Sequence, residues 1–586
     1  MSDSARETRR ARQVQTVQAQ PHSVQAPPRP VWVPAVRVLA GVAAALFLAV
    51  FFVWPILAML VRGVMGEGGG LDASRFLTNL SAARTWRVAW QTVWLAFAGT
   101  AASVLFGVPL AFVLYRLEFP GRRVARAAAM IPFVLPTVVV GGAFRALFDP
   151  AGPYGALGLS QSNAAVVCAM AFFNAAVVAR TTGTVWEKLP PHEEAAATLG
   201  ASPARAFLTV TLPELVPAIA AGASLAFLFC ATSYGLVVTL GTPGYGTLET
   251  EVFIQTTTFL DLPAAAVLSL LQAVIVLVAI WVSGIATRRT EVGLKLGSRR
   301  ARRPGRAAIP AVAMTLIFVV GLVAAPIISL IVASFHRGGA WTVANYVDLV
   351  TPGTFNAGVT PAEAMVNSLR IGAEAALLAL AVGLLVVVAA VRPARSGFGR
   401  WCQRLLDAGA LAPLGISAVT LGFGIFITLR LRVSEPSMLI PVAQALVATP
   451  LVVRAVSPTL LAIDLRLREA AATLGASPWR VMATVDLPAM WRGLGVAAGF
   501  AFAISLGEFG ATSFLATADS ETLPVLVAKL LGRPGSQNYG MAMAAAVVLA
   551  VLAGLVVLLS DMAGDVQRAG DVLERAPHGM ERNQRA

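Results

Sequence analysis

The sequence has little charge and very few cysteine, histidine and lysine residues. Only 13% of its 586 residues are charged and 57% are hydrophobic, which excludes an ordinary water-soluble globular protein. The three cysteines lie far apart without a metal-ligand spacing, so neither a disulfide framework nor a zinc site is predicted. The four histidines lie outside the apolar runs, and no convergent nucleophile, base or metal ligands indicate a membrane-embedded enzyme. No Gly-Lys dipeptide occurs, so a phosphate-binding P-loop is absent.

Long apolar runs recur along the whole chain instead. A helix needs about 20 apolar residues to cross a hydrocarbon core about 30 Å thick. The sequence therefore predicts an all-α, polytopic membrane protein with about 12 transmembrane helices in two parallel six-helix repeats. The predicted spans are residues 38–61, 93–115, 127–148, 163–180, 215–240, 262–287, 309–335, 368–391, 405–428, 438–456, 489–515 and 541–560.

The polar segments predict the organisation and the topology. Residues 1–34 are predicted to be a disordered cytoplasmic tail, 288–306 a basic cytoplasmic linker and 563–586 a second cytoplasmic tail, around the repeats 35–287 and 307–562. The net charge of +15 comes from short arginine clusters between apolar runs, a distribution that indicates topology and argues against nucleic acid. Because arginine-rich loops face the cytoplasm, both termini are predicted to be cytoplasmic.

The strongest signal is an internal repeat. The segment from Glu194 to Arg205 recurs as Glu469 to Arg480 and differs only where Ala204 is replaced by Trp479. We call the difference in residue number between Glu194 and Glu469 the repeat offset. At the same offset Leu212-Pro213 matches Leu487-Pro488, and Thr247-Leu248 matches Thr522-Leu523. The two halves are therefore interpreted as a parallel duplication, with the repeated segment between the fourth and fifth spans of each half.

Each copy of the repeated segment, about 185–213 and 458–488, is predicted to form two short helices joined by a sharp turn. Gly200 and Gly475 are natural helix stops, and Ser202-Pro203 supplies an N-cap and a first helical residue for the second helix. An ordinary surface hairpin is one interpretation. Two near-identical copies in otherwise divergent halves favour the other, which is docking on a two-fold symmetric partner.

These residues resemble the cytoplasmic signature of the inner-membrane permeases of binding-protein-dependent ATP-binding-cassette importers. The matching positions are Glu194, Ala195, Ala196, Gly200 and Pro213 in the first copy, and Glu469, Ala470, Ala471, Gly475 and Pro488 in the second. The resemblance implies a bacterial cytoplasmic-membrane transport subunit that is not an enzyme and holds no cofactor. Its implied partners are an ATP-binding subunit homodimer, which binds ATP-Mg and seats the two loops in its grooves, and a periplasmic or lipid-anchored solute-binding protein.

Polar side chains inside the predicted spans are candidates for the translocation pathway. Glu508 and Phe509 lie near the outer end of the eleventh span, and their counterparts in the first half are Ser233 and Tyr234. Glu508 is interpreted either as a pathway residue or as a carboxylate that reaches water at the interface. The amides of three further residues are predicted to be either interhelical hydrogen-bond partners or substrate contacts; these residues are Asn174, Gln272 and Asn367.

Two classes of transporter can have two six-helix halves. A secondary transporter needs titratable groups at mid-membrane and no paired docking loops, whereas this sequence shows the reverse. The predicted function is therefore an importer permease driven by separate ATPase subunits. The fused layout and the segments 133–141, 172–174 and 505–510 resemble permeases of the thiamine and iron(III) importers, with a preference for thiamine.

Overall fold

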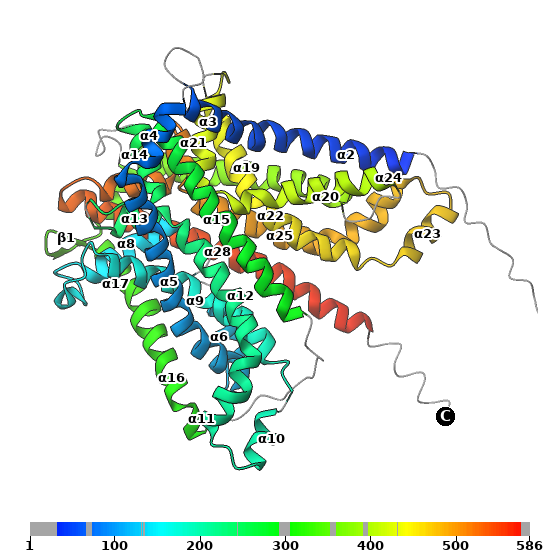
Figure 1. Cartoon of the computed structure of the whole chain (residues 1–586), viewed down its shortest axis with the longest axis horizontal. Coiled ribbons are helices and arrows are strands. Elements are labelled where there is room, and N and C mark those ends of the chain that lie inside the picture. Colours follow the sequence, from blue (N-terminus) through cyan, green and yellow to red (C-terminus); the bar gives the residue numbers. More distant parts are fainter. Residues whose placement is uncertain are drawn as a thin grey trace, which may run out of the picture.

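The computed structural model shows two helical arms that diverge from a shared junction (Figure 1). It describes residues 32–65, 73–129, 132, 135–190, 192–242, 244–291, 305–351, 359–390, 396–430 and 432–575. Most of the predicted tails and linker lies outside these ranges. At their borders the described helices run past the predicted limits, because α2 begins at Trp32, α15 ends at Glu291 and α28 ends at Arg575.

Helices make up nearly all of the regular structure of the described residues. The elements of the first half are α2 (Trp32–Leu48), the π-helical η2 (Ala49–Val53), α3 (Trp54–Val64), α4 (Ala73–Ser81), α5 (Ala83–Arg116), α6 (Arg122–Ala128), α8 (Thr137–Phe148), the 3₁₀ turn η3 (Gly155–Leu157), α9 (Asn163–Trp186), α10 (His192–Thr198), α11 (Pro203–Ala206), the π-helical η4 (Phe207–Thr211), α12 (Leu212–Ala231), α13 (Tyr234–Leu240), α14 (Leu248–Thr257) and α15 (Leu262–Glu291).

The second half repeats this order and adds a two-residue hairpin. Its elements are the 3₁₀ turn η5 (Arg306–Ala308), α16 (Ile309–Leu316), the π-helical η6 (Ile317–Ala324), α17 (Ala325–Ser334), β1 (His336–Arg337), β2 (Ala340–Trp341), α18 (Ala344–Val350), α19 (Pro361–Ala390), α20 (Gly397–Leu411), the 3₁₀ turns η7 (Ala412–Gly415) and η8 (Pro436–Met438), α21 (Ala418–Leu429), α22 (Leu439–Leu461), α23 (Leu465–Thr473), α24 (Pro478–Val481), the π-helical η9 (Met482–Asp486), α25 (Leu487–Gly507), α26 (Thr512–Leu515), α27 (Leu523–Leu531) and α28 (Ser536–Arg575). The strands β1 and β2 are antiparallel, with His336 opposite Trp341.

The all-α, multi-pass architecture is confirmed. Within the described ranges, nine helices are long and apolar enough to cross a membrane, and two bent helix pairs raise the number to as many as 11. The bent pairs fall at the predicted ninth and eleventh spans, where the axis turns by 105° between η7 and α21 and by 57° within α25, between Trp491 and Gly493. The predicted third span is represented by the short helix α8, which has 12 residues.

Two predicted spans end earlier than expected. The span predicted for 215–240 stops with α12 at Ala231, and the span predicted for 489–515 stops with α25 at Gly507. In both halves the chain then breaks and continues as a short helix, α13 or α26. Between the fifth and sixth predicted spans, residues Leu248–Thr257 form the buried helix α14, whose N-terminus carries a capping box between Thr247 and Thr250.

The first helix of each half packs on the other half. Helix α2 lies along α19 and α20, and the segment of α16 and η6 lies along α5 and α9. The Arg37 guanidinium donates to the carbonyl oxygen of Ala389 at 3.3 Å, and the rings of Phe106 and Phe318 stack with centroids 5.4 Å apart. Because the first helix of each half packs on the other half, the two halves are held together along their lengths.

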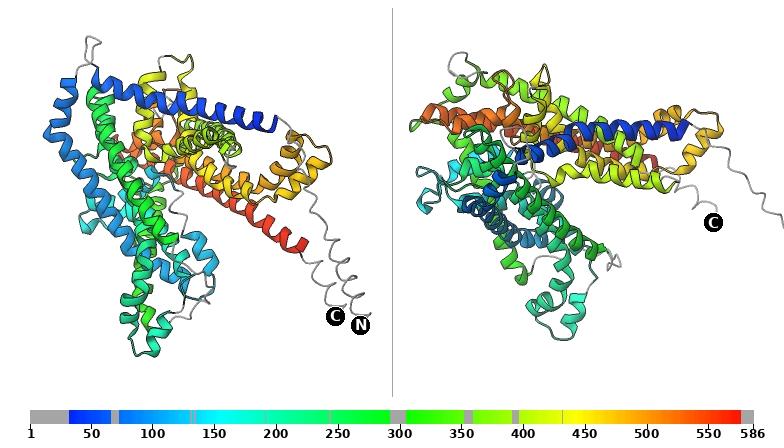
Figure 2. Two further views of the ribbon diagram at one scale, coloured as in Figure 1. Left: turned by 45° about the vertical axis from the view of Figure 1, so that its right-hand side comes forward. Right: turned by 45° about the horizontal axis from the view of Figure 1, so that its top comes forward.

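The repeated loops lie at the free ends of the two arms, far from the junction. Figure 1 shows α10 and α11 at the end of one arm and α23 and α24 at the end of the other, and both views in Figure 2 show the same separation. The largest buried apolar cluster lies at the junction and along the second arm, and it includes residues from both halves. The two arms therefore meet at one end and are apart at the other.

Candidate functional site

The two repeated loops have the predicted helix, turn and helix. Gly200 and Gly475 have backbone φ angles of +82° and +79°, the left-handed region in which glycine is cheap and a branched side chain is strained. The Ser202 hydroxyl accepts a hydrogen bond from the Arg205 amide at 3.3 Å, which confirms the predicted N-cap. The second copy repeats this cap with Ser477.

The signature residues lie on the outside of these loops. Ala195, Gly200 and Pro213 are exposed, and Ala196 is half-buried. Helix α10 carries Glu194, of which only the backbone position is described. In the second copy Glu469, Ala470 and Ala471 lie on α23, Gly475 forms the turn, and Pro488 lies in the first turn of α25.

Two leucines at the tips of the loops are not part of the sequence signature. The residues before the turn glycines, Leu199 and Leu474, are 89% and 87% exposed. An exposed leucine is ordinary by itself, but here the same apolar side chain stands at equivalent positions of both loops. The sequence does contain a sign of these two leucines, because each copy of the repeat has a leucine directly before its turn glycine.

Each loop is tied to the span that follows it, but by different chemistry in the two halves. In the first half the Thr211 hydroxyl donates to the carboxylate of Glu193, and Arg116 pairs with that carboxylate at 3.5 Å. In the second half the equivalent tether is the ion pair between Arg468 and Asp486. The tethers hold the first helix of each loop against the start of the next span.

The helix after each turn continues into the membrane span. A π-helical turn, η4 or η9, directly precedes the Leu-Pro pair in each half. Proline has no N–H to donate to the preceding turn, so a wider turn fits at this point. The predicted end of the second helix at Pro213 is therefore replaced by one continuous helix from Pro203 to Ala231.

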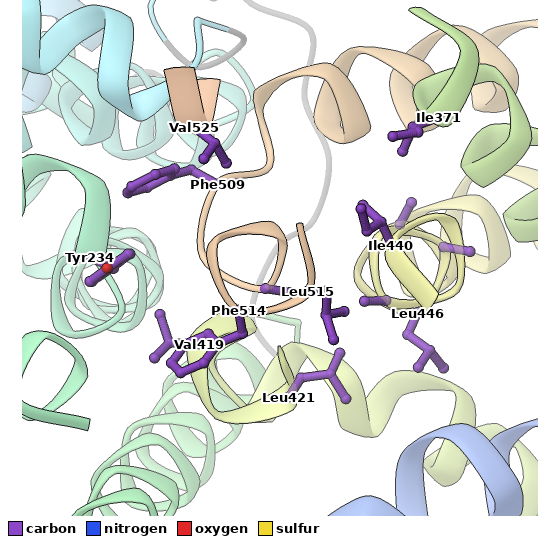
Figure 3. Packing of buried hydrophobic residues seen from close by; sticks show 14 of the residues in the cluster. Tyr234, Ile371, Val419, Leu421, Ile440, Leu446, Phe509, Phe514, Leu515 and Val525 are labelled. Atoms are coloured by element: carbon purple, nitrogen blue, oxygen red, sulfur yellow. The ribbon is translucent and has the colours of Figure 1, made fainter. Parts of the chain in front are cut away.

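The four pathway candidates meet at the junction of the arms. Tyr234 and Phe509, which are related by the repeat offset, stack with ring centroids 5.2 Å apart and planes 13° apart. Ser233 and Glu508 stand beside them at the helix breaks. Figure 3 shows Tyr234 and Phe509 on their separate segments, with buried side chains of the second half around them.

Further aromatic residues extend this contact across the junction. Phe253 of α14 packs 5.7 Å from Tyr234 and 5.2 Å from Phe514 of α26, and Phe514 lies 6.2 Å from Phe423 of α21. The rings therefore come from both halves. This packing closes the junction end of the molecule.

The carboxylate of Glu508 is buried and fully engaged within its own chain. One oxygen accepts from the Ala511 amide at 2.7 Å, and the other accepts from the amide and the hydroxyl of Thr512 at 3.0 and 2.6 Å. These bonds cap the start of α26 across the break that follows Gly507. In this arrangement Glu508 holds the broken helix together, and its role in a pathway stays a prediction.

A second buried carboxylate, Glu249, lies between the fifth and sixth predicted spans. It is 2% exposed in the first turn of α14. The Ser417 hydroxyl and the Tyr234 amide lie beside its carboxylate, but neither oxygen has a hydrogen bond of standard geometry. Glu249 lies outside the long apolar runs, so the hydrophobic pattern of the sequence does not predict that it is buried.

The polar side chains inside the spans connect helices to one another. Asn174 donates to Cys230 of α12 at 3.4 Å, and Gln272 donates to the Ala231 carbonyl at 2.9 Å. Asn367 of α19 donates to the carbonyl oxygens of Asp519 and Glu521 at 3.0 and 3.2 Å. All three side chains therefore form hydrogen bonds between segments, which is one of the two roles predicted for them.

The duplication extends to single hydrogen bonds. The Thr92 hydroxyl accepts from the Leu248 amide at 2.9 Å, and the Ser368 hydroxyl accepts from the Leu523 amide at 2.7 Å. Leu248 and Leu523 are a pair that the repeat offset relates. Each bond fixes the start of a buried short helix, α14 or α27, against the second span of its own half.

Comparison with known proteins agrees with the repeated architecture. The sequence profile of the binding-protein-dependent transport system inner membrane component matches residues 103–292 and again residues 384–565. The thiamine transport system permease protein ThiP of Brucella abortus is 28% identical over 557 residues, which cover 90% of this chain and 96% of that protein.

Two further similarities cover one half. The sulfate transport system permease protein CysT of Escherichia coli is 32% identical over 246 residues, which cover 40% of this chain and 87% of CysT. The crystal structure of a bacterial ABC transporter involved in alginate import shares 15% identity at a TM-score of 0.38, over 44% of this chain and 96% of that one. Because the family profile matches twice and covers more than half of the sequence, the chain belongs to the binding-protein-dependent transport system inner membrane components, as two such halves fused into one polypeptide.

Proposed function

We propose that this chain is the membrane-spanning permease of an ATP-binding-cassette importer that carries a small organic cation of the thiamine type into the bacterial cytoplasm. In this proposal the chain binds no nucleotide. A homodimer of ATP-binding subunits docks on the two repeated loops, and a separate solute-binding protein delivers the solute to the outer face. Both termini lie in the cytoplasm.

The observation that carries the proposal is the pair of loop tips. Leu199 and Leu474 stand almost fully exposed at equivalent positions, each fixed by a left-handed glycine turn and a serine cap. Burying one leucine side chain in a groove contributes about 1.5–3 kcal/mol, so two grooves of a symmetric partner would supply about 3–6 kcal/mol. A secondary transporter has no use for such paired tips.

The arrangement of the arms supports an alternating-access mechanism. The junction is closed by the Tyr234–Phe509 stack, while the loop ends lie apart (Figure 1). We interpret this as a state that is closed on the outer face and open toward the cytoplasm. Closure of two ATPase subunits would draw the loops together, and the arms would then separate at the stack.

The assignment to a thiamine-type solute rests on two supports. The ThiP protein of Brucella abortus aligns along 90% of the chain, and the junction combines stacked aromatic rings with the buried carboxylate of Glu249. Aromatic faces and carboxylates attract an organic cation in a poorly hydrated site. An iron(III) species is the second candidate, because carboxylates also suit a hard cation.

The docking test replaces the two tip leucines. The variant that combines Leu199→Asp with Leu474→Asp is expected to lose nearly all of the ATP-binding subunit that co-purifies with the wild type. Leu157→Asp, at a 60% exposed leucine away from the loops, is the matched control and should keep it. Full capture of the ATP-binding subunit by the double variant would contradict the proposed docking site.

The solute is tested by reconstitution. The chain, the ATP-binding subunit and the solute-binding protein encoded beside them are placed in proteoliposomes, and uptake of labelled thiamine and of labelled iron(III) is compared. We expect ATP-dependent uptake of thiamine alone. Uptake of iron(III) without thiamine would overturn the solute and leave the permease role standing.

A further inference from the structure

A cavity of about 390 Å³ lies inside the second arm, between α19, α20 and α22. Its volume falls in the range of small-molecule pockets, about 300–1,000 Å³. Among the residues that the structure describes, those that line it are Val386, Val387, Ala390, Arg400, Gln403, Arg404, Asp407, Val453, Ser457 and Leu461. One side is therefore apolar, and the other carries two guanidinium groups and one carboxylate.

The first arm holds aromatic side chains in the corresponding region. The second spans of the two halves align at one residue more than the repeat offset, as the paired bonds of Thr92 and Ser368 show, so Val387 corresponds to Ala111 and Ala390 to Leu114. Near the ends of α5 and α9 the rings of Phe112 and Trp186 pack with centroids 5.4 Å apart. The described residues that line the cavity include no aromatic side chain.

The polar side of the cavity has also changed. In the first arm Arg126 lies over the Tyr115 ring at 4.2 Å and pairs with Glu187 at 2.9 Å. The third spans of the two halves align at an offset slightly larger than the repeat offset. At this larger offset the start of α8 matches the start of α21, and Arg126 matches Asp407. Glu187 corresponds to Ala462 by the repeat offset. The second arm therefore lacks the residues that form this ion pair.

A matched hydrogen bond supports this alignment of the two arms. Arg122 donates to the Leu114 carbonyl at 2.8 Å, and Gln403 donates to the Ala389 carbonyl at 2.7 Å. The two donors are related by the larger offset, and the two acceptors lie within one residue of equivalent positions on α5 and α19. The same kind of contact therefore joins these helices in both arms.

The cavity lies where two membrane spans end. Helix α19 ends at Ala390 and α22 ends at Leu461, on the same side as the loop that follows α22. The neighbouring helix α20 exposes Phe398 and Trp401, whose rings stack 6.0 Å apart. Exposed aromatic residues at the end of a span are typical of the membrane interface.

We propose that this cavity binds an anionic phospholipid of the cytoplasmic leaflet. The acyl chain would lie on the apolar wall formed by Val387, Val453 and Leu461, and the phosphate would meet the guanidinium groups of Arg400 and Arg404. Basic pockets between transmembrane helices on the cytoplasmic side suit such headgroups. Two guanidinium groups against the single carboxylate of Asp407 favour an anionic lipid over a zwitterionic one.

The test is native mass spectrometry of the purified complex with its ATP-binding subunit, from membranes that contain phosphatidylglycerol and phosphatidylethanolamine. We expect phosphatidylglycerol on the wild type. Combined Arg400→Gln and Arg404→Gln should reduce the bound fraction at least fivefold. Arg454→Gln, at an exposed arginine of α22 that does not line the cavity, should leave it unchanged.

A second variant fills the cavity with larger side chains, by Val387→Phe, Ala390→Tyr and Leu461→Trp. It should exclude the lipid while the arginines remain, and size-exclusion chromatography would report whether the complex is intact. Should the filled variant not assemble, the arginine variant decides the question by itself.

Four results would overturn the proposal. They are a wild type without bound lipid, equal lipid on the wild type and the arginine variant, equal retention of phosphatidylethanolamine, and displacement of the lipid by millimolar inorganic phosphate. The lipid readout depends on neither the transported solute nor the docking of the loops.

Discussion

The buried carboxylate of Glu508 provides the sharpest test of the junction. Its two oxygens accept three hydrogen bonds, from the amides of Ala511 and Thr512 and from the Thr512 hydroxyl. Glutamine has the same size but only one acceptor oxygen, so Glu508→Gln would turn an NH₂ group toward one of the two backbone amides. A buried donor left without an acceptor costs about 1–3 kcal/mol.

We therefore expect Glu508→Gln to lower the free energy of unfolding by about 1–3 kcal/mol, measured by denaturant titration in mixed micelles. The matched control is Glu374→Gln, at a carboxylate whose side chain is 52% exposed on α19, where a change below about 0.5 kcal/mol is expected. Uptake is then normalised to the assembled complex. Unchanged stability together with lost uptake would refute the capping role and place Glu508 in the pathway.

Three further predictions concern the loops and the junction. Gly475→Val should reduce capture of the ATP-binding subunit, because a β-branched residue in the left-handed region costs about 1–3 kcal/mol although open space surrounds the site; equal capture in a pull-down would contradict a fixed turn. Glu249→Gln should keep or raise the free energy of unfolding, because it removes a buried carboxylate without a full hydrogen bond, and a loss above about 1 kcal/mol would argue against this. Single cysteines at Ser202 and Ser477 in a cysteine-free background should resist an impermeant thiol reagent in intact cells, whereas labelling of both from outside would reverse the topology.

Much of the architecture follows from the sequence alone, because it depends on signals along one chain. Long apolar runs must become spans, since backbone polar groups need internal partners in lipid. The near-identical segments after Glu194 and Glu469 locate both loops, and the glycine and serine of each copy predict the turn and the cap that the structure confirms. These features are local, so no knowledge of distant contacts is needed.

The contacts between the halves required the tertiary structure. Nothing in the sequence shows that Tyr234 stacks on Phe509, that Glu508 caps α26, or that Glu249 lies buried at the junction, because these depend on how segments fold onto one another. The helix breaks after Ala231 and Gly507 escape prediction for the same reason, since an apolar run reads as one span until packing decides where it bends. The cavity beside α20 is the extreme case, because its lining residues come from three helices that are far apart in the sequence, and only the packed helices bring them together.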